Sequence, residues 1–359
     1  MTKIGIVTGG GDCPGLNAVI RAVAKAAAQR GWESVGVLGG YEGLLEPAQT
    51  VALDYQATTG LLTRGGTILG TANRGKFSSK TGHGETRALP TELIEGTRAG
   101  MKKLGLHALV SIGGDGSLTI AQQMHEHGIP VVGVPKTIDN DLHGTILTFG
   151  FDSAVACATD ALDRLHTTAE SHRRVLVLEV MGRYAGWIAL YAGIAGGADV
   201  ILIPEIPFSY ERVCAKVAER EAKGKHFTLV VVAEGAREKD ADFVTSGSGE
   251  ANREAKLGGI GAVVTAEIEK RTKKEARNCV LGHLQRGGSP TTFDRTLCSM
   301  FGAHAVELIA AGDFGKMVGF VGPSVGAVPI SEAIGRLKTV PPEGGLARTA
   351  RALGISLGD

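Results

Sequence analysis

The stretch Val-Pro-Lys-Thr-Ile-Asp-Asn-Asp-Leu at residues 134–142 ends an apolar run and places several polar side chains on one turn. Such a run predicts a buried parallel strand, and Pro135 ends its hydrogen-bonded ladder. Ligands bind beyond the carboxyl ends of strands in α/β sheets. Thr137, Asp139 and Asp141 are spaced by two, so in an extended segment they share one side. We expect these side chains to take part in catalysis or metal binding. The alternative is an Asx-type turn that only caps backbone amides.

Length and composition narrow the class of protein. The chain has 359 residues, whereas single hydrophobic cores stop growing near roughly 250 to 300 residues, so we expect two lobes. A net charge of +1 provides no field to attract nucleic acid or an anionic membrane, and neither is an expected partner. Five scattered cysteines without Cys-x-x-Cys spacing, and no apolar run approaching about 18 residues, predict a soluble cytoplasmic protein.

Two glycine loops follow apolar runs and precede helical patterns. Gly11 lies in the loop at residues 9–15, and Asp115 lies in the loop at residues 113–117, before a helix expected from Leu118. Backbone amides in such loops approach phosphate oxygens closely, and a carboxylate among them can hold Mg²⁺. The alternatives are a tight turn for the first loop and an N-cap role for Asp115. These loops and residues 134–142 predict three strands of one parallel sheet.

Further polar groups lie in a glycine-punctuated segment and in the second half of the chain. Asn73 and Arg74 end the segment at residues 60–74, whose arginines can reach phosphate or remain solvated. The second half repeats the strand and helix alternation and places a cationic and acidic set at strand ends: Arg174, Arg183, Glu234, Arg277, His283 and Arg286. Guanidinium groups bind phosphate bidentately, so the set predicts a phosphosugar site, although each charge alone would be an ordinary surface group.

Taken together, five segments resemble the motifs of the 6-phosphofructokinase family, in its order and spacing. They are Gly-Gly-Gly-Asp-Cys-Pro-Gly-Leu-Asn at 9–17, Gly-Gly-Asp-Gly-Ser at 113–117, Pro-Lys-Thr-Ile-Asp-Asn-Asp at 135–141, Met-Gly-Arg at 181–183 and Gly-His-Leu-Gln-Arg-Gly-Gly at 282–288. The resemblance implies an α/β fold of two similar Rossmann-like lobes, each a mainly parallel sheet flanked by helices. It also implies Mg²⁺-dependent phosphoryl transfer from ATP, or in some members pyrophosphate, to the 1-hydroxyl of fructose 6-phosphate.

The resemblance assigns a role to each matching residue. Asp139 becomes the catalytic base, with Thr137 beside it and Arg183 at the transferring group, while Asp115 holds Mg²⁺. The donor phosphates are lined by Gly11, Asn73, Arg74, Gly114, Asp115, Gly116 and Ser117. The sugar phosphate is bound by Thr137, Ile138, Asp139, Arg174, Met181, Gly182, Arg183, Glu234, Arg277, His283, Leu284, Gln285 and Arg286.

The resemblance also implies that the two lobes bind different substrates and that the chain forms an oligomer. Residues 1–149 with about 283–332 form the donor lobe, and residues 150–282 with about 333–359 form the fructose 6-phosphate lobe. Part of the sugar site in this family comes from a neighbouring subunit, so we expect a homo-oligomer, a tetramer or a dimer. At the bacterial effector site Arg21 matches, but Tyr55 and His166 stand where arginines are expected, which argues against effector control of the usual kind.

Two residues bear on the phosphoryl donor. Lys136 stands where the common bacterial ATP-using enzymes have glycine, as in the pyrophosphate-using and mixed branches, and it suits either donor. Gly116 is the ATP-like choice, because a carboxylate there would repel an α-phosphate. We therefore predict ATP as the donor, with pyrophosphate as the alternative.

Two further readings compete with this one. A related NAD or lipid kinase shares the Gly-Gly-Asp-Gly loop but leaves the other motifs unassigned. A non-catalytic sugar-phosphate sensor on the same fold is a third possibility, since fold does not fix function. Retention of both Asp115 and Asp139 favours the enzyme over the sensor.

Overall fold

The computed structural model describes residues 1–72, 75–78, 86–245 and 257–359, which form two compact units. Unit 1 comprises Met1–Ile138, Leu142–Ser153 and Arg286–Leu337; unit 2 comprises Asp139–Asp141, Ala154–Gln285 and Lys338–Asp359. The chain therefore changes unit at 153/154, 285/286 and 337/338, where the sequence led us to expect 149/150, 282/283 and 332/333. The three-residue excursion at Asp139–Asp141 was not expected.

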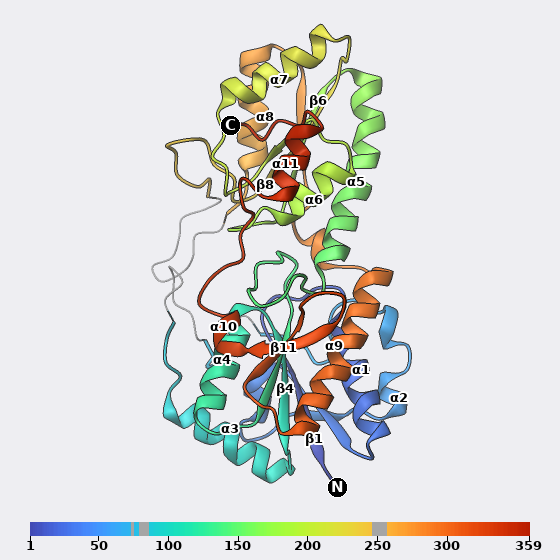
Figure 1. The fold of residues 1–359 in the computed structure, drawn as a ribbon, viewed down its shortest axis with the longest axis vertical. Coiled ribbons are helices and arrows are strands. Elements are labelled where there is room, and N and C mark those ends of the chain that lie inside the picture. Colours follow the sequence, from blue (N-terminus) through green and yellow to red (C-terminus); the bar gives the residue numbers. More distant parts are fainter. Residues whose placement is uncertain (73–74, 79–85, 246–256) are drawn as a thin grey trace. The chain divides into compact units, whose positions relative to one another are not determined.

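A seven-stranded sheet forms the centre of unit 1 (Figure 1). Its order is β11 (Val325–Pro329), β10 (Lys316–Phe320), β5 (Val131–Pro135), β4 (Ala108–Gly113), β1 (Lys3–Thr8), β2 (Glu33–Val37) and β3 (Thr50–Ala52). The inner strands run parallel, and the two edge strands, β11 and β3, run antiparallel to their neighbours. Strands β1, β4 and β5 are neighbours in one parallel sheet, as predicted.

Helices cover both faces of this sheet, which explains why its central strands are mainly apolar and buried throughout. Figure 1 shows α1 (Leu16–Gln29) and α9 (Thr292–Ala311) on one face, with α3 (Thr91–Leu104), α4 (Asp115–Glu126) and α10 (Ile330–Ala333) on the other. Helices α1 and α9 approach closely because Gly302 has no side chain. A Cβ there would lie 2.6 Å from Ala22 Cβ and 3.0 Å from the Val19 carbonyl oxygen.

A four-stranded parallel sheet forms the centre of unit 2, in the order β7 (Val200–Leu202), β8 (Thr228–Ala233), β6 (Val175–Val180) and β9 (Ala276–Val280). Alternate side chains of β6 face opposite layers. Val175 and Val177 pack in a cluster with α7 (Tyr210–Ala222) and α8 (Ile260–Thr272). Leu176 packs with Ala169 of α5 (Phe151–His172). Helices α6 (Trp187–Ala195) and α11 (Gly345–Ala352) complete the unit.

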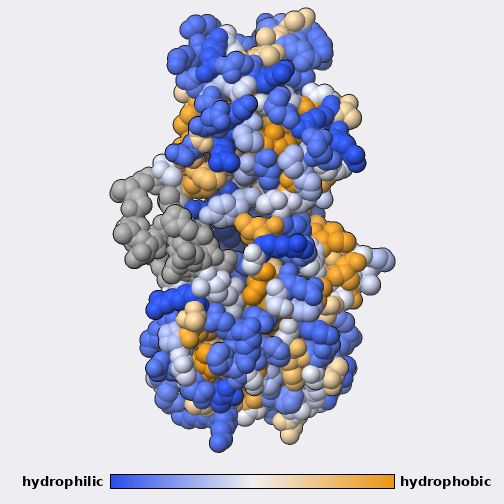
Figure 2. Space-filling model, turned by 60° about the vertical axis from the view of Figure 1, so that its left-hand side comes forward, coloured by the Kyte–Doolittle hydropathy of each residue, from blue (hydrophilic) through white to orange (hydrophobic). Residues whose placement is uncertain are grey.

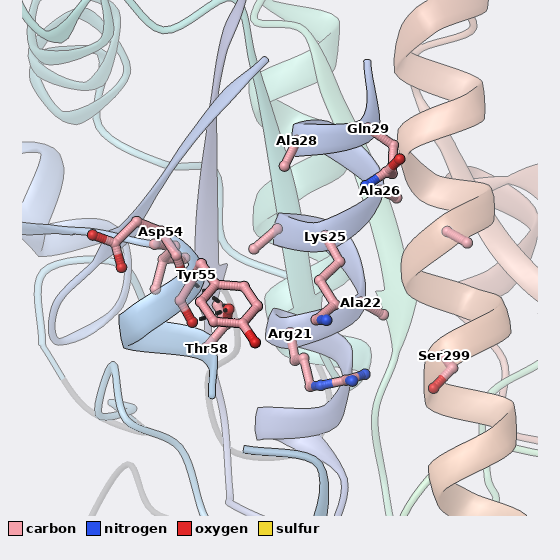
Figure 3. Close-up of a pocket in the computed structure, with 13 residues that line it drawn as sticks. Arg21, Ala22, Lys25, Ala26, Ala28, Gln29, Asp54, Tyr55, Thr58 and Ser299 are labelled. Atoms are coloured by element: carbon pink, nitrogen blue, oxygen red, sulfur yellow. Dashed lines mark hydrogen bonds between the residues drawn. The ribbon is translucent and has the colours of Figure 1, made fainter. Parts of the chain in front are cut away.

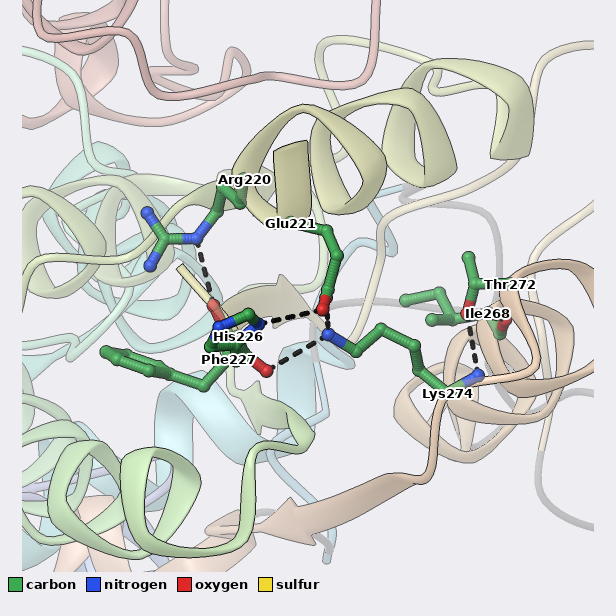
Figure 4. Close-up of polar contacts among 7 residues, drawn as sticks. All are labelled: Arg220, Glu221, His226, Phe227, Ile268, Thr272 and Lys274. Atoms are coloured by element: carbon green, nitrogen blue, oxygen red, sulfur yellow. Dashed lines mark hydrogen bonds and ion pairs between the residues drawn. The ribbon is translucent and has the colours of Figure 1, made fainter. Parts of the chain in front are cut away.

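Polar contacts join α7, α8 and the start of β8 at the amino edge of this sheet (Figure 4). Lys274, after α8, donates from Nζ to the His226 carbonyl oxygen at 3.0 Å and forms an ion pair with Glu221 of α7. Arg220 donates from Nε to the Phe227 carbonyl oxygen at 3.0 Å. These contacts satisfy carbonyl groups just before β8 begins, so they fix where the strand enters the sheet.

The face drawn in Figure 2 is largely hydrophilic, with hydrophobic residues in separate areas. No helix in the described part of the chain is long and apolar enough to cross a membrane. All five cysteines are free thiols, and Cys13 and Cys298 are buried.

Two elements differ from the sequence-based expectation. Helix α4 begins at Asp115 and not at Leu118, because the first turn follows β4 directly through Gly114. Helix α5 runs from Phe151 to His172, whereas the helical spacing of apolar residues predicts a helix only over about 154–168. Both differences lie at helix ends, where capping groups from elsewhere in the fold decide the boundary.

Candidate active site

The loops that follow β1, β4 and β5 contact one another at the carboxyl edge of the unit 1 sheet. The Gly9 amide donates to the Ile112 carbonyl at 3.0 Å, and the Lys136 amide donates to the Gly113 carbonyl at 2.9 Å. Glycine is required for this approach: a Cβ at Gly9 would lie 2.5 Å from Ser117 Oγ, and one at Gly113 would lie 2.3 Å from Ser117 Cβ. The three loops therefore form one cluster, as residues 9–15, 113–117 and 134–142 predicted.

Helix α4 presents its amino end to this cluster. Gly114 is the N-cap, in extended backbone and without a side-chain cap hydrogen bond, and Asp115 is the first helical residue. The alternative that Asp115 is itself the N-cap is therefore wrong. Amides in the first turn have no partners within the helix and favour an anion, while Gly116 and Ser117 follow Asp115 in that turn. The edge thus combines amide donors with the partly exposed carboxylate of Asp115.

A magnesium ion fits this arrangement in one specific way. Within the described ranges, no group of three or more His, Cys, Asp or Glu side chains is placed to hold a metal. Mg²⁺ commonly uses one or two carboxylates and completes its shell with water and substrate phosphates. Asp115 beside the α4 amino end matches this kind of site, and it does not match an all-protein metal cage.

Two cationic side chains, those of Lys136 and Arg286, donate hydrogen bonds to the glycine loop that follows β1. Lys136, which is 4 % exposed, donates from Nζ to the Gly11 carbonyl, and Arg286 donates from Nη1 to the Asp12 carbonyl at 3.2 Å. A Cβ at Gly11 would lie 2.8 Å from that same Nη1, so the guanidinium packs directly on the loop. Arg286 thus belongs to unit 1 and contacts the predicted donor loop. Burial raises the pKa of the neighbouring Cys13 thiol to about 12, which keeps it protonated.

The carboxyl edge of the unit 2 sheet gathers a second group of predicted site residues. The Met181 amide donates to Oε1 of the buried Gln285 at 3.3 Å. Glu234 follows β8, and the next amide, of Gly235, donates to the Gly182 carbonyl at 3.1 Å. The Arg183 guanidinium lies 5.3 Å from the centre of the Tyr184 ring. His283 and Leu284 follow β9 and are exposed.

Arg174 and Arg277 lie at the opposite, amino edge of the same sheet, so the expectation that Arg277 and His283 cluster around one strand end is wrong. Arg174 directly precedes β6, and Arg277 is the second residue of β9. Both pair with Glu275, through Arg174 Nε at 2.7 Å and Arg277 Nη2 at 2.5 Å. The six residues of β6 separate this pair from Met181 along the strand.

The segment after β5 divides between the units. Thr137 and Ile138 belong to unit 1, where Thr148 Oγ1 donates to the Thr137 carbonyl at 2.7 Å and Ile138 is fully buried. Asp139–Asp141 belong to unit 2. There Lys338 donates from Nζ to Asn140 Oδ1 at 2.8 Å and from its backbone amide to the Asp141 carbonyl at 2.8 Å. The sequence carries no local signal for Lys338, which stands 198 positions beyond Asn140.

Two other predictions concern residues away from these edges. Asn73 and Arg74 lie outside the described residues. Arg21 lines a pocket of about 510 Å³ between α1, α2 (Tyr55–Thr58) and α9 (Figure 3). Lys25 Nζ lies 5.6 Å from the centre of the Tyr55 ring, and Asp54 uses Oδ1 to accept the Ala57 amide. The pocket therefore has two cations, with its carboxylate engaged in capping α2.

Fold and sites together define a class of α/β protein in which glycine loops and helix ends at sheet edges bind phosphorylated ligands. The family model described as phosphofructokinase matches residues 3–309. The chain belongs to the phosphofructokinase family.

Relatives span the whole chain. An ATP-dependent 6-phosphofructokinase of Chloroflexus aurantiacus is 53 % identical over 357 residues, 99 % of this chain and 98 % of its own length. A pyrophosphate–fructose 6-phosphate 1-phosphotransferase of Streptomyces coelicolor is 51 % identical over 343 residues, 95 % of this chain and 96 % of its own. The solved phosphofructokinase of Saccharomyces cerevisiae shares 31 % identity with a TM-score of 0.80, over 93 % of this chain and 45 % of that chain.

Proposed function

We propose that this chain is an ATP-dependent 6-phosphofructokinase that transfers the γ-phosphoryl group of ATP to the 1-hydroxyl of fructose 6-phosphate, giving fructose 1,6-bisphosphate and ADP. The observation that carries the proposal is the loop cluster at the carboxyl edge of unit 1. It joins the glycine loop, the α4 amino end and the Asp115 carboxylate, the groups that phosphoryl transfer from a nucleotide requires. The full-length relatives support the same reaction.

The proposed chemistry needs one base and several electrostatic contacts. Asp139 accepts the proton of the sugar 1-hydroxyl, whose oxygen attacks the γ-phosphorus while the bond to the leaving oxygen of ADP breaks. Arg183 neutralises charge on the transferring group. Asp115 holds Mg²⁺, which supplies charge neutralisation at the donor phosphates. Amides of the glycine loop and of the α4 amino end bind those phosphates.

The acceptor sugar is assigned to the carboxyl edge of unit 2, where Met181, Gly182, Glu234, His283, Leu284 and Gln285 gather. Glu234 is suited to the sugar hydroxyls, and His283 is an exposed donor for the 6-phosphate. Arg174 and Arg277 face away from this edge within their own unit, so their predicted contact with the 6-phosphate requires a neighbouring copy of the chain. This geometry supports a homo-oligomer with sugar sites shared between chains.

The donor is proposed as ATP because position 116 is glycine. Relatives of similar identity are named as ATP-dependent and as pyrophosphate-dependent enzymes, so family likeness alone does not choose between donors. In α4, Gly116 is the second helical residue, and its lack of a carboxylate leaves room for the α-phosphate of a nucleotide. Pyrophosphate is the second candidate, since the cation of Lys136 is compatible with either donor.

A coupled assay tests the proposal. Purified protein with Mg²⁺, ATP and fructose 6-phosphate should release ADP only when the sugar phosphate is present. The same sample is then assayed with pyrophosphate in place of ATP. Turnover with pyrophosphate alone would replace the donor. Binding of fructose 6-phosphate without turnover from either donor would favour the non-catalytic sensor.

A further inference from the structure

Lys338 lies in the C-terminal segment, far in sequence from every motif, yet it contacts the loop that carries Asp139. Its Nζ donates to Asn140 Oδ1 at 2.8 Å, and its backbone amide donates to the Asp141 carbonyl at 2.8 Å. Both contacts fall on the two residues that directly follow the proposed base. A single lysine therefore fixes this loop through a side chain and through the backbone.

The lysine is itself held in place. Its carbonyl oxygen accepts the indole Nε1 of Trp187, the first residue of α6, at 2.8 Å. Two residues further on, the Val340 amide donates to Glu205 Oε1 at 2.7 Å, and the same carboxylate accepts the Gly186 amide just before α6. Lys338 is thus anchored to the amino end of α6, a regular helix of unit 2. Its hydrogen bonds to Asn140 and Asp141 in turn restrain residues 139–141.

The loop needs such support because of its backbone conformation. Asn140 has φ of 51°, in the left-handed region that is strained for a residue other than glycine. Asn140 is also 2 % exposed, so its amide group requires hydrogen-bond partners within the protein. The charged Lys338 donor supplies one of them, and a charge-assisted bond is about twice as strong as a neutral one.

We propose that Lys338 is a positioning residue for the reaction, which holds the Asp139 carboxylate in register through Asn140 and Asp141. The proposal rests on the proposed function, because it takes Asp139 as the base. Positioning of this kind acts on the chemical step: a catalytic group misplaced by about 1 Å can lower the rate roughly 100-fold.

The charge state of Lys338 gives the proposal a second readout. Burial lowers the pKa of Lys338 to about 8, and the carboxylate of Asp141 opposes that shift. Other ionisable groups tied to this segment are Glu205, which accepts the Val340 amide, and His143, which contacts Arg336. As pH rises through about 8 the ammonium is lost and the bond to Asn140 weakens. We expect kcat of the wild type to fall over that range.

The central experiment measures steady-state kinetics of Lys338→Met with ATP and fructose 6-phosphate. We expect kcat to fall about 10- to 100-fold, with the KM of both substrates changed far less, because the loop and not the binding groups is disturbed. Lys338→Arg retains a cation and should recover part of kcat, with the fall at alkaline pH moved upward. Equilibrium binding of fructose 6-phosphate to Lys338→Met shows that the protein is folded.

Two companion variants sharpen the result. Asn140→Gly adopts the left-handed conformation freely but cannot accept the lysine bond, so it should lose kcat as Lys338→Met does. Lys216→Met is the matched control: this lysine of the same unit has a side chain 14 % exposed and pairs with Glu219 at 3.1 Å, away from the loop. Its kcat should equal that of the wild type.

The outcomes separate the two proposals. A wild type without turnover from either donor overturns the proposed function. An active wild type with an equally active Lys338→Met, or with a Lys338→Arg whose pH profile is unchanged, overturns the positioning role. Loss of kcat in the Lys216→Met control would also count against it, since the effect would then not be specific to the loop.

Discussion

Asp139 is the residue on which the proposed chemistry depends most. Asp139→Asn keeps the size of the side chain and removes its ability to accept a proton. Loss of a general base typically lowers the rate by about 10² to 10⁴, so we expect turnover to fall by at least that range while fructose 6-phosphate still binds. Asp160→Asn is the control, because Asp160 is an exposed carboxylate paired with Arg164. Turnover of Asp139→Asn close to that of the wild type would remove Asp139 as the base.

Gly116 is the residue expected to choose the donor. Two unit charges about 4 Å apart interact by roughly 4 kcal/mol at an effective dielectric of 20, enough for a carboxylate at this position to exclude an α-phosphate. Gly116→Asp should therefore depress activity with ATP far more than any activity with pyrophosphate. Folding should be preserved, since an acidic residue in the first turn of a helix is favourable. Gly116→Ala, which adds no charge, is the control, and equal losses with both donors would contradict the prediction.

For Lys136, the sequence predicted a cation near the donor but not the group that it contacts. The sequence indicated a cation compatible with either donor. In the structure its Nζ bonds the Gly11 carbonyl, and Arg286 bonds the Asp12 carbonyl, so both side chains support the glycine loop. That Arg286 also binds the 6-phosphate stays a prediction. A motif gives the type of residue, but the partner of a long cationic side chain depends on groups far away in sequence.

Among the elements, the amino end of α5 depends on a carboxylate from another helix. Asp294 of α9 accepts the Gly150 amide at 3.0 Å, the Ser153 amide at 2.9 Å and the Ser153 hydroxyl at 2.5 Å. It therefore caps α5 across more than a hundred residues of sequence. This contact explains why α5 starts at Phe151, earlier than helical periodicity alone predicted.

The Asp294 cap should make stability depend on pH. Burial raises the pKa of Asp294 to about 6, above its value in the unfolded chain, and the nearby Asp152 adds to the rise. The folded protein therefore holds this proton more tightly, and the resulting stability, present at acidic pH, is lost as pH rises through about 6. Denaturant midpoints of the wild type should decline between about pH 4 and about pH 6, the interval between the pKa in the unfolded chain and that in the folded protein.

Asp294→Asn is the variant that checks this origin. It removes the titration, so the decline attributable to position 294 should vanish. It also replaces one acceptor oxygen by a donor, so the variant should be less stable at every pH by about 1 to 3 kcal/mol. A variant with the same dependence of midpoint on pH as the wild type would assign the effect to another group.

Local elements were predictable where the signal is local. Runs such as residues 3–8 and 228–233 are mainly apolar, because helices cover both faces of their sheets, and β1 and β8 occupy those same residues. The glycine loops followed from the same pattern. Arg174 and Arg277 were misplaced although the sequence held the information: each stands at the start of its strand, whereas Met181, Glu234 and His283 come after one. Order along the chain decides which edge of a parallel sheet a residue occupies.

At the scale of the whole molecule, the proposed sugar site draws on residues from both edges of the unit 2 sheet. Met181, Glu234 and His283 lie at the carboxyl edge, while Arg174 and Arg277 lie at the amino edge beside Glu275. If all of them bind one sugar phosphate, the arginines serve the site of a neighbouring copy. The sequence indicated the oligomer only through family resemblance. The residues at a sheet edge do not themselves reveal whether they face another copy of the chain.

Mixed oligomers test this arrangement. Arg277→Ala removes the proposed phosphate contact supplied to a neighbour, and Asp139→Asn removes the base supplied by the chain itself, so each variant alone should be nearly inactive. When both are co-expressed, one of the two sites in a mixed pair combines the intact Asp139 of one chain with the intact Arg277 of the other. Random pairing should restore about one quarter of wild-type activity.

The matched control pairs two defects that belong to the same loop of the same chain. Co-expression of Asp139→Asn with Lys338→Met leaves every site with a missing base or a displaced loop, so activity should stay at the sum of the separate variants. Recovery in the Arg277 mixture together with none in the Lys338 mixture places Arg277 in a neighbour's site and Lys338 in its own. Without recovery in the Arg277 mixture, Arg277 does not act across chains, and its pairing with Glu275 at 2.5 Å is then its structural role at the amino edge.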